Sequence, residues 1–456
     1  MSKKFNRMCS LFTMSVLTAS LVNIPTTHAM ENNNIEFSYD YSAYEAAETE
    51  INSLMDNLGI RDEEVDYNEI VDGYGTGFAP PREEEYELLK NIPFVESVPT
   101  MTYEQLPSSI NLTTSKYFPP VGNQGSQGSC AAWSAGYYCH TFEQAKAHDL
   151  DASSGSSDAI MSVAWLYNKV NYGQDKGSWM ATNMDVATKI GNASETTMPY
   201  NPYDYSSWGE EVAWREAPKY KATGYEQTSV KNIEVIKSWL AEGSLVSIAL
   251  DANQYNRAFY DNNVMSNYEY YAGRPNHANT IVGYDDSITD DGEQGAFLIV
   301  NSWGDTWGPN NDGTFYMTYD CLKTLAHNVG IRYTGAKYDE YTSPELIATW
   351  EFSRKGSRDS DINVSLGSSN QDATITTGGT YLFPSFMALD ITDMKEDFEL
   401  GESRFELNTG YNAGTVSAFN IELYDDFNSG VPTRVSDDAQ NVPANSPATV
   451  IVDFSY

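Results

Sequence analysis

Residues 123–133 read NQGSQGSCAAW, a polar, glycine-containing loop that ends in the apolar start of a predicted helix. Asn, Gly and Ser favour turns, and the glycines permit a tight backbone path. From Cys130 onward, apolar residues recur three or four positions apart, as on one helix face: Ala132, Ala135, Cys139, Phe142 and Ala145. Because a helix N-terminus favours the thiolate over the thiol, we predict that Cys130 is a nucleophile; a buried structural thiol is the alternative.

Among the chain's five histidines, His277 is the best candidate for a general base. It precedes an apolar strand at residues 278–284, and a second strand at 296–300 leads into Asn301. A hairpin centred near Thr289 would place Tyr284 opposite Gln294 and His277 opposite Asn301, where the amide orients the imidazole ring. The other histidines are excluded by expected removal, by distance along the Cys130 helix or by lack of a polar partner: His28, His140, His148 and His327.

Three blocks, NQGSQGSC, NHANTIVGYDD and LIVNSWGDTWG, resemble the active-site blocks of papain-like cysteine peptidases in the same order. Cys130 also precedes His277 by the roughly 130–150 residues typical of that family. The resemblance implies an α+β fold with a two-lobed catalytic domain, in which a helical lobe and a β-barrel-like lobe flank a cleft. It implies that Cys130 is the nucleophile, His277 the general acid/base and Asn301 the residue that orients His277.

The same resemblance assigns four further residues to the site. Gln124 would form the oxyanion hole with the Cys130 backbone N–H, and Trp303 would cover the Asn301–His277 hydrogen bond. Gly177 and Ser178 would bind the substrate backbone, unless they form an ordinary loop at a helix start.

The sequence departs from the family at two places near the nucleophile. Gln127 stands where the family commonly has a cysteine that forms a disulfide, and Ala131 follows the nucleophile where Trp is usual. Neither change removes a catalytic group. Cys139 and Cys321 either pair in an oxidising compartment or remain buried thiols.

The chain divides by composition into four parts. Residues 1–29 resemble a secretory signal peptide, typical of a bacterial exported protein. Residues 30–106 are acidic and are expected to form a propeptide whose tail, residues 91–107, crosses the cleft; a solvated leader is the alternative. Residues 107–336 form the catalytic domain. Residues 342–456 show short, turn-bounded strand candidates that predict a β-sandwich-like domain, with cell-surface carbohydrate as one candidate ligand.

The composition of the chain argues against some classes of binding partner. The formal net charge of −37 argues against nucleic acid and anionic membranes, and no transmembrane segment is expected. The Asp-rich loop at 285–293 lacks the spacing of a calcium loop, so we expect a solvated turn there, with no metal and no cofactor.

Together these features predict a secreted or cell-surface cysteine endopeptidase made as a zymogen. It would hydrolyse protein or peptide substrates through a thioester acyl-enzyme, with its own propeptide as inhibitor. Two alternatives stay open: an acyltransferase or transpeptidase of the same fold, and a catalytically silent surface adhesin.

Overall fold

The computed structural model describes residues 59–97 and 106–451 with short internal gaps. The gaps are 63, 84, 260–262, 272, 326–328, 335–342, 353–358, 368, 377–384, 400–403, 410–414, 437–441 and 444–447. The predicted signal peptide and His327 lie outside the described residues. By its internal contacts the chain divides into residues 1–44 and 45–456, and every described residue belongs to the second unit.

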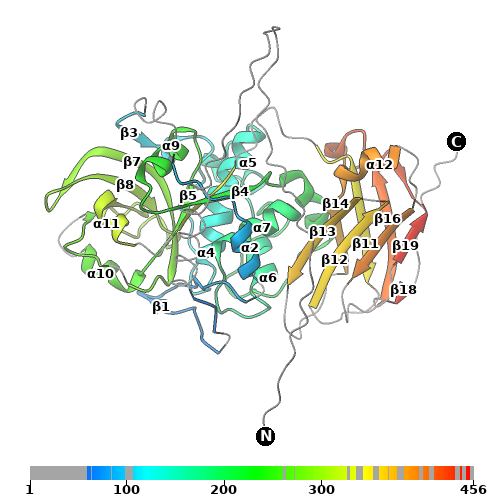
Figure 1. Ribbon diagram of the computed structural model, residues 1–456, viewed down its shortest axis with the longest axis horizontal. Coiled ribbons are helices and arrows are strands. Elements are labelled where there is room, and N and C mark those ends of the chain that lie inside the picture. The colour runs from blue at the N-terminus through cyan, green and yellow to red at the C-terminus, as the bar shows by residue number, and fades with distance from the viewer. Residues whose placement is uncertain are drawn as a thin grey trace, which may run out of the picture. The chain divides into compact units, whose positions relative to one another are not determined.

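A long helix that begins at Cys130 lies at the centre of the helical lobe (Figure 1). It comprises α4 (Cys130–Ala132), a stretch of wider π-helical turns labelled η2 (Trp133–His140) and α5 (Thr141–Ala147). The predicted N-terminus is therefore confirmed. The expected single apolar face is too narrow, because residues 129–145 are buried on all sides of this helix. Polar side chains such as Ser134 are buried with them and bond to the neighbouring sheet.

Two further helices belong to this lobe, α6 (Val163–Val170) and α7 (Met180–Lys189). Ser162 caps α6 by accepting a hydrogen bond from Trp165 N at 3.1 Å. The other α-helices are α2 (Tyr86–Asn91), α8 (Glu211–Glu216), α9 (Ile233–Ala241), α10 (Tyr255–Ala258), α11 (Tyr319–Thr324) and α12 (Lys395–Glu399). The 3₁₀ turns are η1 (Leu112–Thr114), η3 (Ala152–Ser154), η4 (Ser157–Ala159), η5 (Ala217–Tyr220), η6 (Ala252–Gln254), η7 (Thr392–Met394) and η8 (Phe427–Ser429).

The second lobe is built on one sheet of order β4-β10-β5-β7-β8-β9-β6, with β3 also paired to β7. Its strands are β3 (Ser109–Asn111), β4 (Tyr225–Ser229), β5 (Val246–Leu250), β6 (Val264–Met265), β7 (His277–Asp290), β8 (Glu293–Val300), β9 (Thr314–Thr318) and β10 (Val329–Tyr333). The apolar runs of β5, β7 and β8 are buried, as their composition predicts.

The β7–β8 hairpin forms with a different register from the predicted one. Tyr284 pairs with Phe297 rather than Gln294, and the last ladder pair before the site is Thr280 with Val300. Bulges shift the register twice along the hairpin. The loop expected from residue 285 is instead strand up to a tight turn at Asp291-Gly292, where φ is 46° and 84°.

Part of the predicted propeptide is described, and it packs on both lobes. Strands β1 (Ile70–Val71) and β2 (Tyr74–Gly75) form a short hairpin, and α2 follows. Residues 91–97 run beside β4, where Val95 N donates to Gln227 O at 2.8 Å.

The C-terminal region is β-rich, as predicted. One sheet has the order β14-β11-β16-β17 with β18 paired to β16, and a second sheet has the order β13-β12-β15-β19. Buried side chains from both sheets, including Trp350, Phe405 and Phe419, belong to one hydrophobic core. The strands are β11 (Leu346–Phe352), β12 (Asp359–Leu366), β13 (Ser369–Thr376), β14 (Phe386–Asp390), β15 (Arg404–Thr409), β16 (Thr415–Leu423), β17 (Arg434–Val435), β18 (Val442–Pro443) and β19 (Ala448–Ile451).

Ion pairs join this β-rich region to the helical lobe. Arg215 of α8 donates to both carboxylate oxygens of Glu422 at 3.2 and 2.9 Å, and its guanidinium lies 4.6 Å from the Phe386 ring centre. Lys221 pairs with Asp390 at 3.2 Å. Since the Glu422 side chain is only 7% exposed, removal of its partner leaves a poorly hydrated carboxylate.

Within the described residues, no helix is long and apolar enough to span a bilayer. Cys139 and Cys321 are free buried thiols in separate hydrophobic cores. The thiol alternative therefore holds for both.

Glu422→Ala is expected to lower the free energy of unfolding by about 2 kcal/mol, because it removes hydrogen bonds to a charged, buried group. Glu211→Ala is the matched control: Glu211 bonds the same guanidinium at 2.7 Å, but its side chain is 55% exposed, so we expect at most about 0.5 kcal/mol. Thermal unfolding of the full chain measures both. An equal loss of unfolding free energy in the two variants would contradict a larger contribution from the buried pair.

Candidate active site

Cys130 lies where the two lobes meet. Its Sγ accepts a hydrogen bond from the Ala278 backbone N–H of β7 at 3.2 Å. One turn along the same helix, Ser134 Oγ donates to the Asn279 carbonyl at 2.8 Å and contacts Thr280 Oγ1 at 2.7 Å. These bonds tie the helix that carries the predicted nucleophile to the strand that carries His277.

His277 and Asn301 are brought together despite the shifted register. His277 Nε2 lies 2.7 Å from Asn301 Oδ1, and both residues are fully buried. The Trp303 ring lies beside the imidazole, with ring centres 4.6 Å apart, so Trp303 has the predicted position. Among the described residues, His277 Nδ1 has no hydrogen-bond partner. The ring nitrogen that does not face Asn301 is therefore free of competing partners.

Gln124 is held by its carbonyl oxygen, so its amide nitrogen is presented to the site. Ser302 Oγ donates to Gln124 Oε1 at 2.6 Å, and the carbonyls around the other end of the side chain identify that end as the donor nitrogen. Gln124 Nε2 donates to the carbonyls of Gly75 and Thr76, at 3.0 and 3.2 Å, and to that of Gln127 at 2.8 Å. A carbonyl of the N-terminal region thus occupies the predicted oxyanion-binding position.

Residues 74–79, here called the covering segment, lie across the site. Tyr74 stacks on Trp303 with ring centres 5.2 Å apart, and Trp303 Nε1 donates to the Gly75 carbonyl at 3.2 Å. A Cβ at Gly75 would lie 2.5 Å from the Gln127 carbonyl oxygen, and one at Gly77 would lie 2.1 Å from that of Gly128. Only glycine permits this close backbone approach.

The expectation that residues 91–107 cross the cleft is wrong for their described part. Residues 91–97 lie against β4, and the covering segment takes the place assigned to them. The physical reason is size, since the approach to the Gln127 and Gly128 carbonyls requires glycines that residues 91–107 lack.

Ser178 pairs with the covering segment through its backbone, whereas the backbone groups of Gly177 bond to Tyr167 and Arg61. Ser178 N donates to the Gly77 carbonyl at 2.9 Å, and Ala79 N donates to the Ser178 carbonyl at 3.1 Å. The bridge between Phe78 and Ser178 is parallel. Phe78 itself is buried, with 3% of its surface exposed. Ser178, one of the two predicted substrate-binding residues, therefore presents backbone groups to the covering segment.

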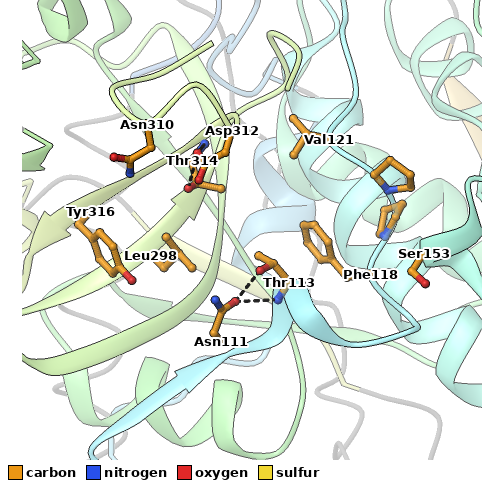
Figure 2. A pocket seen from close by; sticks show the side chains of 12 residues that line it. Asn111, Thr113, Phe118, Val121, Ser153, Leu298, Asn310, Asp312, Thr314 and Tyr316 are labelled. Carbon is orange, nitrogen blue, oxygen red and sulfur yellow. Dashed lines mark hydrogen bonds between the residues drawn. The ribbon is translucent and has the colours of Figure 1, made fainter. Parts of the chain in front are cut away.

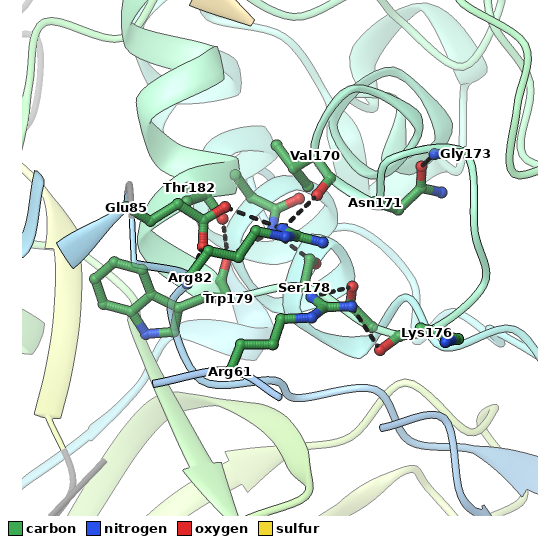
Figure 3. Close-up of polar contacts among 12 residues, drawn as sticks. Arg61, Arg82, Glu85, Val170, Asn171, Gly173, Lys176, Ser178, Trp179 and Thr182 are labelled. Carbon is green, nitrogen blue, oxygen red and sulfur yellow. Dashed lines mark hydrogen bonds and ion pairs between the residues drawn. The ribbon is translucent and has the colours of Figure 1, made fainter. Parts of the chain in front are cut away.

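Two buried arginines, Arg61 and Arg82, lie before and after the covering segment in the sequence and bond to the catalytic domain (Figure 3). Arg61 donates to the Gly177 and Lys176 carbonyls at 3.1 and 3.2 Å. Arg82 donates to the Val170 carbonyl at 3.4 Å and to Glu85 at 3.1 Å. Both guanidinium groups thus bond backbone carbonyls in and around the 170–177 loop.

Burial sets the charge state of the covered pair. It raises the pKa of the Cys130 thiol to about 12, against the opposing effect of backbone N–H groups at Ala278, Ala131 and Cys130. It lowers the pKa of His277 to about 4, against the opposing effect of the Asn301 hydrogen bond. Between these values the covered site holds a neutral thiol and a neutral imidazole.

Polar contacts replace the disulfide expected by comparison with the family. Gln127 Nε2 donates to the Asn201 and Asp204 carbonyls, each at 3.4 Å. Next to it, Gly128 N donates to Asp175 Oδ1 at 2.8 Å, and Tyr167 donates to the same oxygen at 2.8 Å. The nucleophile loop is therefore linked to the loop that precedes Gly177.

Sequence reasoning missed the polar residues around the triad candidates, namely Tyr255, Asn279 and Ser302. Asn279 donates to Asn301 Oδ1 at 3.1 Å and accepts from Tyr255 at 2.5 Å. An Asn within an otherwise apolar buried strand is an available signal, because a buried amide requires partners.

One cavity and one cluster of acidic side chains include none of the predicted site residues. A cavity of about 560 Å³ (Figure 2) contains none of the predicted site residues. Its lining includes Asn111, Phe118, Val121, Leu298, Asp312 and Tyr316. A possible metal-binding group, Glu269, Asp290 and Asp291, has its oxygens within 4.8 Å of one another near the β7–β8 turn.

The family model and the curated relatives that match this chain point to the same family. Residues 106–331 match the family model described as papain family cysteine protease. Cathepsin K of Mus musculus is 30% identical over 207 residues, which are 45% of this chain and 58% of the relative. Procathepsin L of Rattus norvegicus is 26% identical over 226 residues, with the same coverage. The chain thus spans less than two thirds of these relatives.

Two solved structures are similar at lower identity. Xylellain, a cysteine protease from Xylella fastidiosa, has a TM-score of 0.45 at 22% identity, covering 59% of this chain and 99% of that chain. A recombinant stem bromelain precursor has a TM-score of 0.43 at 20% identity, covering 65% and 91%. On the family match and the curated relatives, residues 106–331 form a papain family cysteine protease domain.

Proposed function

We propose that this protein is a cysteine endopeptidase made as a zymogen, with Cys130, His277 and Asn301 as its catalytic triad. The observation that carries the proposal is a peptide, residues 74–79, bonded to Gln124 and Ser178 in the candidate site. A substrate backbone placed in the same cleft finds the same donors and acceptors.

Acylation begins when His277 takes the Cys130 proton. The thiolate attacks the scissile carbonyl carbon, a C–S bond forms, and the carbonyl electron pair moves to oxygen. Gln124 Nε2 and the Cys130 N–H stabilise this oxyanion. The hydrogen bond from Ser302 holds the Gln124 side chain in place before the reaction. The tetrahedral intermediate collapses, the C–N bond breaks, and His277 protonates the leaving amine.

Deacylation uses the same groups in the opposite direction. His277 removes a proton from water, the hydroxide attacks the thioester carbonyl, and the C–S bond breaks. The products are a carboxylic acid and a regenerated Cys130. Asn301 holds the His277 ring in one orientation during both proton transfers, and Trp303 excludes water from their hydrogen bond.

The proposed zymogen is held inactive by position and by charge state. The covering segment fills the oxyanion site and the backbone-binding site, and its burial of Cys130 and His277 favours the uncharged pair. On this proposal residues 1–29 are a signal peptide, 30–106 a propeptide, 107–336 the catalytic domain and 342–456 an accessory domain. Secretion and maturation follow from these assignments.

Cys130 is expected to react with an epoxide-type cysteine-protease inhibitor only after residues 30–106 are removed. His277→Ala should abolish labelling of the matured protein, because no base then activates the thiol. Peptide mass spectrometry locates the adduct, and the buried thiols Cys139 and Cys321 serve as internal controls. Equal labelling of all three cysteines would contradict the proposal.

Gly75→Ala is expected to dislodge the covering segment, because the added Cβ meets the Gln127 carbonyl at 2.5 Å. Unprocessed protein with this change should hydrolyse peptide substrate at least about fivefold faster than unprocessed wild type, since forcing an extra methyl group into a tight contact costs about 1–3 kcal/mol. Ile70→Ala in the same hairpin is the control, because Ile70 is 57% exposed. Activation by both substitutions would argue for general loosening instead.

The pH dependence of Cys130 alkylation is expected to differ between the two forms. In the unprocessed chain the raised thiol pKa and lowered imidazole pKa keep both groups neutral, so iodoacetamide should react slowly, at a rate that rises about tenfold per pH unit with the small thiolate fraction. Uncovering is expected to lower the thiol pKa, so the processed enzyme should react faster, at a rate that levels off once Cys130 is a thiolate. A thiolate-like rate near pH 6 in the unprocessed chain would contradict this.

A further inference from the structure

Asn301 Oδ1 is the point at which three donors converge. It accepts from His277 Nε2 at 2.7 Å, from Asn279 Nδ2 at 3.1 Å and from the Ser302 backbone N–H at 2.7 Å. The backbone donor is unambiguous, so it assigns the oxygen of the Asn301 amide to this position. An amide turned the other way would place its NH₂ group against two further N–H donors.

Asn279 has a fixed orientation for the same reason. Its Nδ2 must face Asn301 Oδ1, because an oxygen there would oppose an oxygen. Its Oδ1 then faces the Tyr255 hydroxyl, 2.5 Å away, which donates to it. Both side chains are buried, with about 1% exposed, and burial raises the Tyr255 pKa well above its usual value, so the hydroxyl keeps its proton.

The Asn279 contact supplies a link that the sheet does not. The β7–β8 ladder ends at Thr280 and Val300, so Asn301 lies beyond the last backbone pair. Asn279 is anchored on the opposite side by its pairing with Ile248 of β5. Its amide therefore connects the strand of His277 to the loop of Asn301 where the backbone hydrogen bonds between β7 and β8 have stopped.

We infer that Asn279 and Tyr255 are positioning residues, which hold Asn301 Oδ1 as an acceptor toward His277. In this arrangement His277 Nε2 carries the ring proton, and Nδ1 is left unprotonated to accept the proton of Cys130. The relay runs from the Tyr255 hydroxyl through Asn279 and Asn301 to the imidazole. This inference rests on the proposed function of Cys130, His277 and Asn301.

A purely structural role predicts different behaviour. Packing alone requires only the volume of the two side chains, which Leu and Phe would supply at positions 279 and 255 without buried polar groups. The relay instead requires a donor at position 279 and the correct tautomer of His277. The two roles are separated by substitutions that keep volume and change donors.

Tyr255→Phe and Asn279→Leu are expected to lower kcat of the matured enzyme by about threefold and about tenfold, with KM changed less than twofold, because they remove one and two buried hydrogen bonds respectively. Each variant is made as the full chain and processed by added wild-type enzyme, which is then removed. Processing therefore does not depend on the variant's own activity.

Asn279→Asp provides the decisive readout. A protonated carboxyl can donate to Asn301 Oδ1 and accept from Tyr255, whereas an ionised carboxylate has no donor and opposes that oxygen. We therefore expect its kcat, divided by that of wild type, to approach one at low pH and to fall at least about fivefold as pH rises. The ratio cancels titration common to both enzymes, including that of His277 and Cys130. Tyr270 and Asp251, which act electrostatically on Tyr255, are likewise present in both.

A ratio that is flat, or that rises with pH, would overturn the relay. A flat ratio indicates packing only, and a rising ratio indicates that a negative charge assists the imidazolium. If Asn279→Leu fails to fold, the other two variants still decide the question. Absence of both hydrolysis and Cys130 labelling in processed wild type is a different failure, that of the proposed function itself.

Discussion

Contact between the start of the Cys130 helix and strand β7 is the constraint on which the candidate site depends. Ala278 N reaches Cys130 Sγ at 3.2 Å, and Ser134 bonds to the same strand one helical turn later. These short contacts leave little freedom for the two lobes to shift where they meet. They explain why a helix buried on all sides carries polar residues: its partners come from the opposite lobe.

The same closeness makes the site easy to block. A peptide that satisfies Gln124 and Ser178 must pass near the Gln127 and Gly128 carbonyls, and residues 74–79 do so with glycines at the two tightest points. Buried arginines at positions 61 and 82 secure the flanks through backbone carbonyls (Figure 3). The proposed inhibition thus combines occupied hydrogen-bonding groups with burial that favours the neutral forms of Cys130 and His277.

Sequence patterns predicted the elements that carry the site better than their detailed pairing. The start of the helix at Cys130, the apolar strands and the β-rich C-terminal region follow from periodicity and composition. The hairpin register does not, because bulges in β7–β8 arise from long-range packing. The expectation that residues 91–97 cross the cleft is wrong because no local sequence pattern shows that Gly75 and Gly77 approach the carbonyls of Gln127 and Gly128. Asn279 shows that one polar residue in a buried strand merits attention.

The most direct test of the account is hydrolysis of a fluorogenic peptide by the purified full chain, before and after proteolytic removal of residues 30–106. The account predicts little activity before removal, a large rise afterwards, and none in the processed Cys130→Ser variant. Undiminished activity in that variant, or processed wild type that remains inactive while folded, would contradict it.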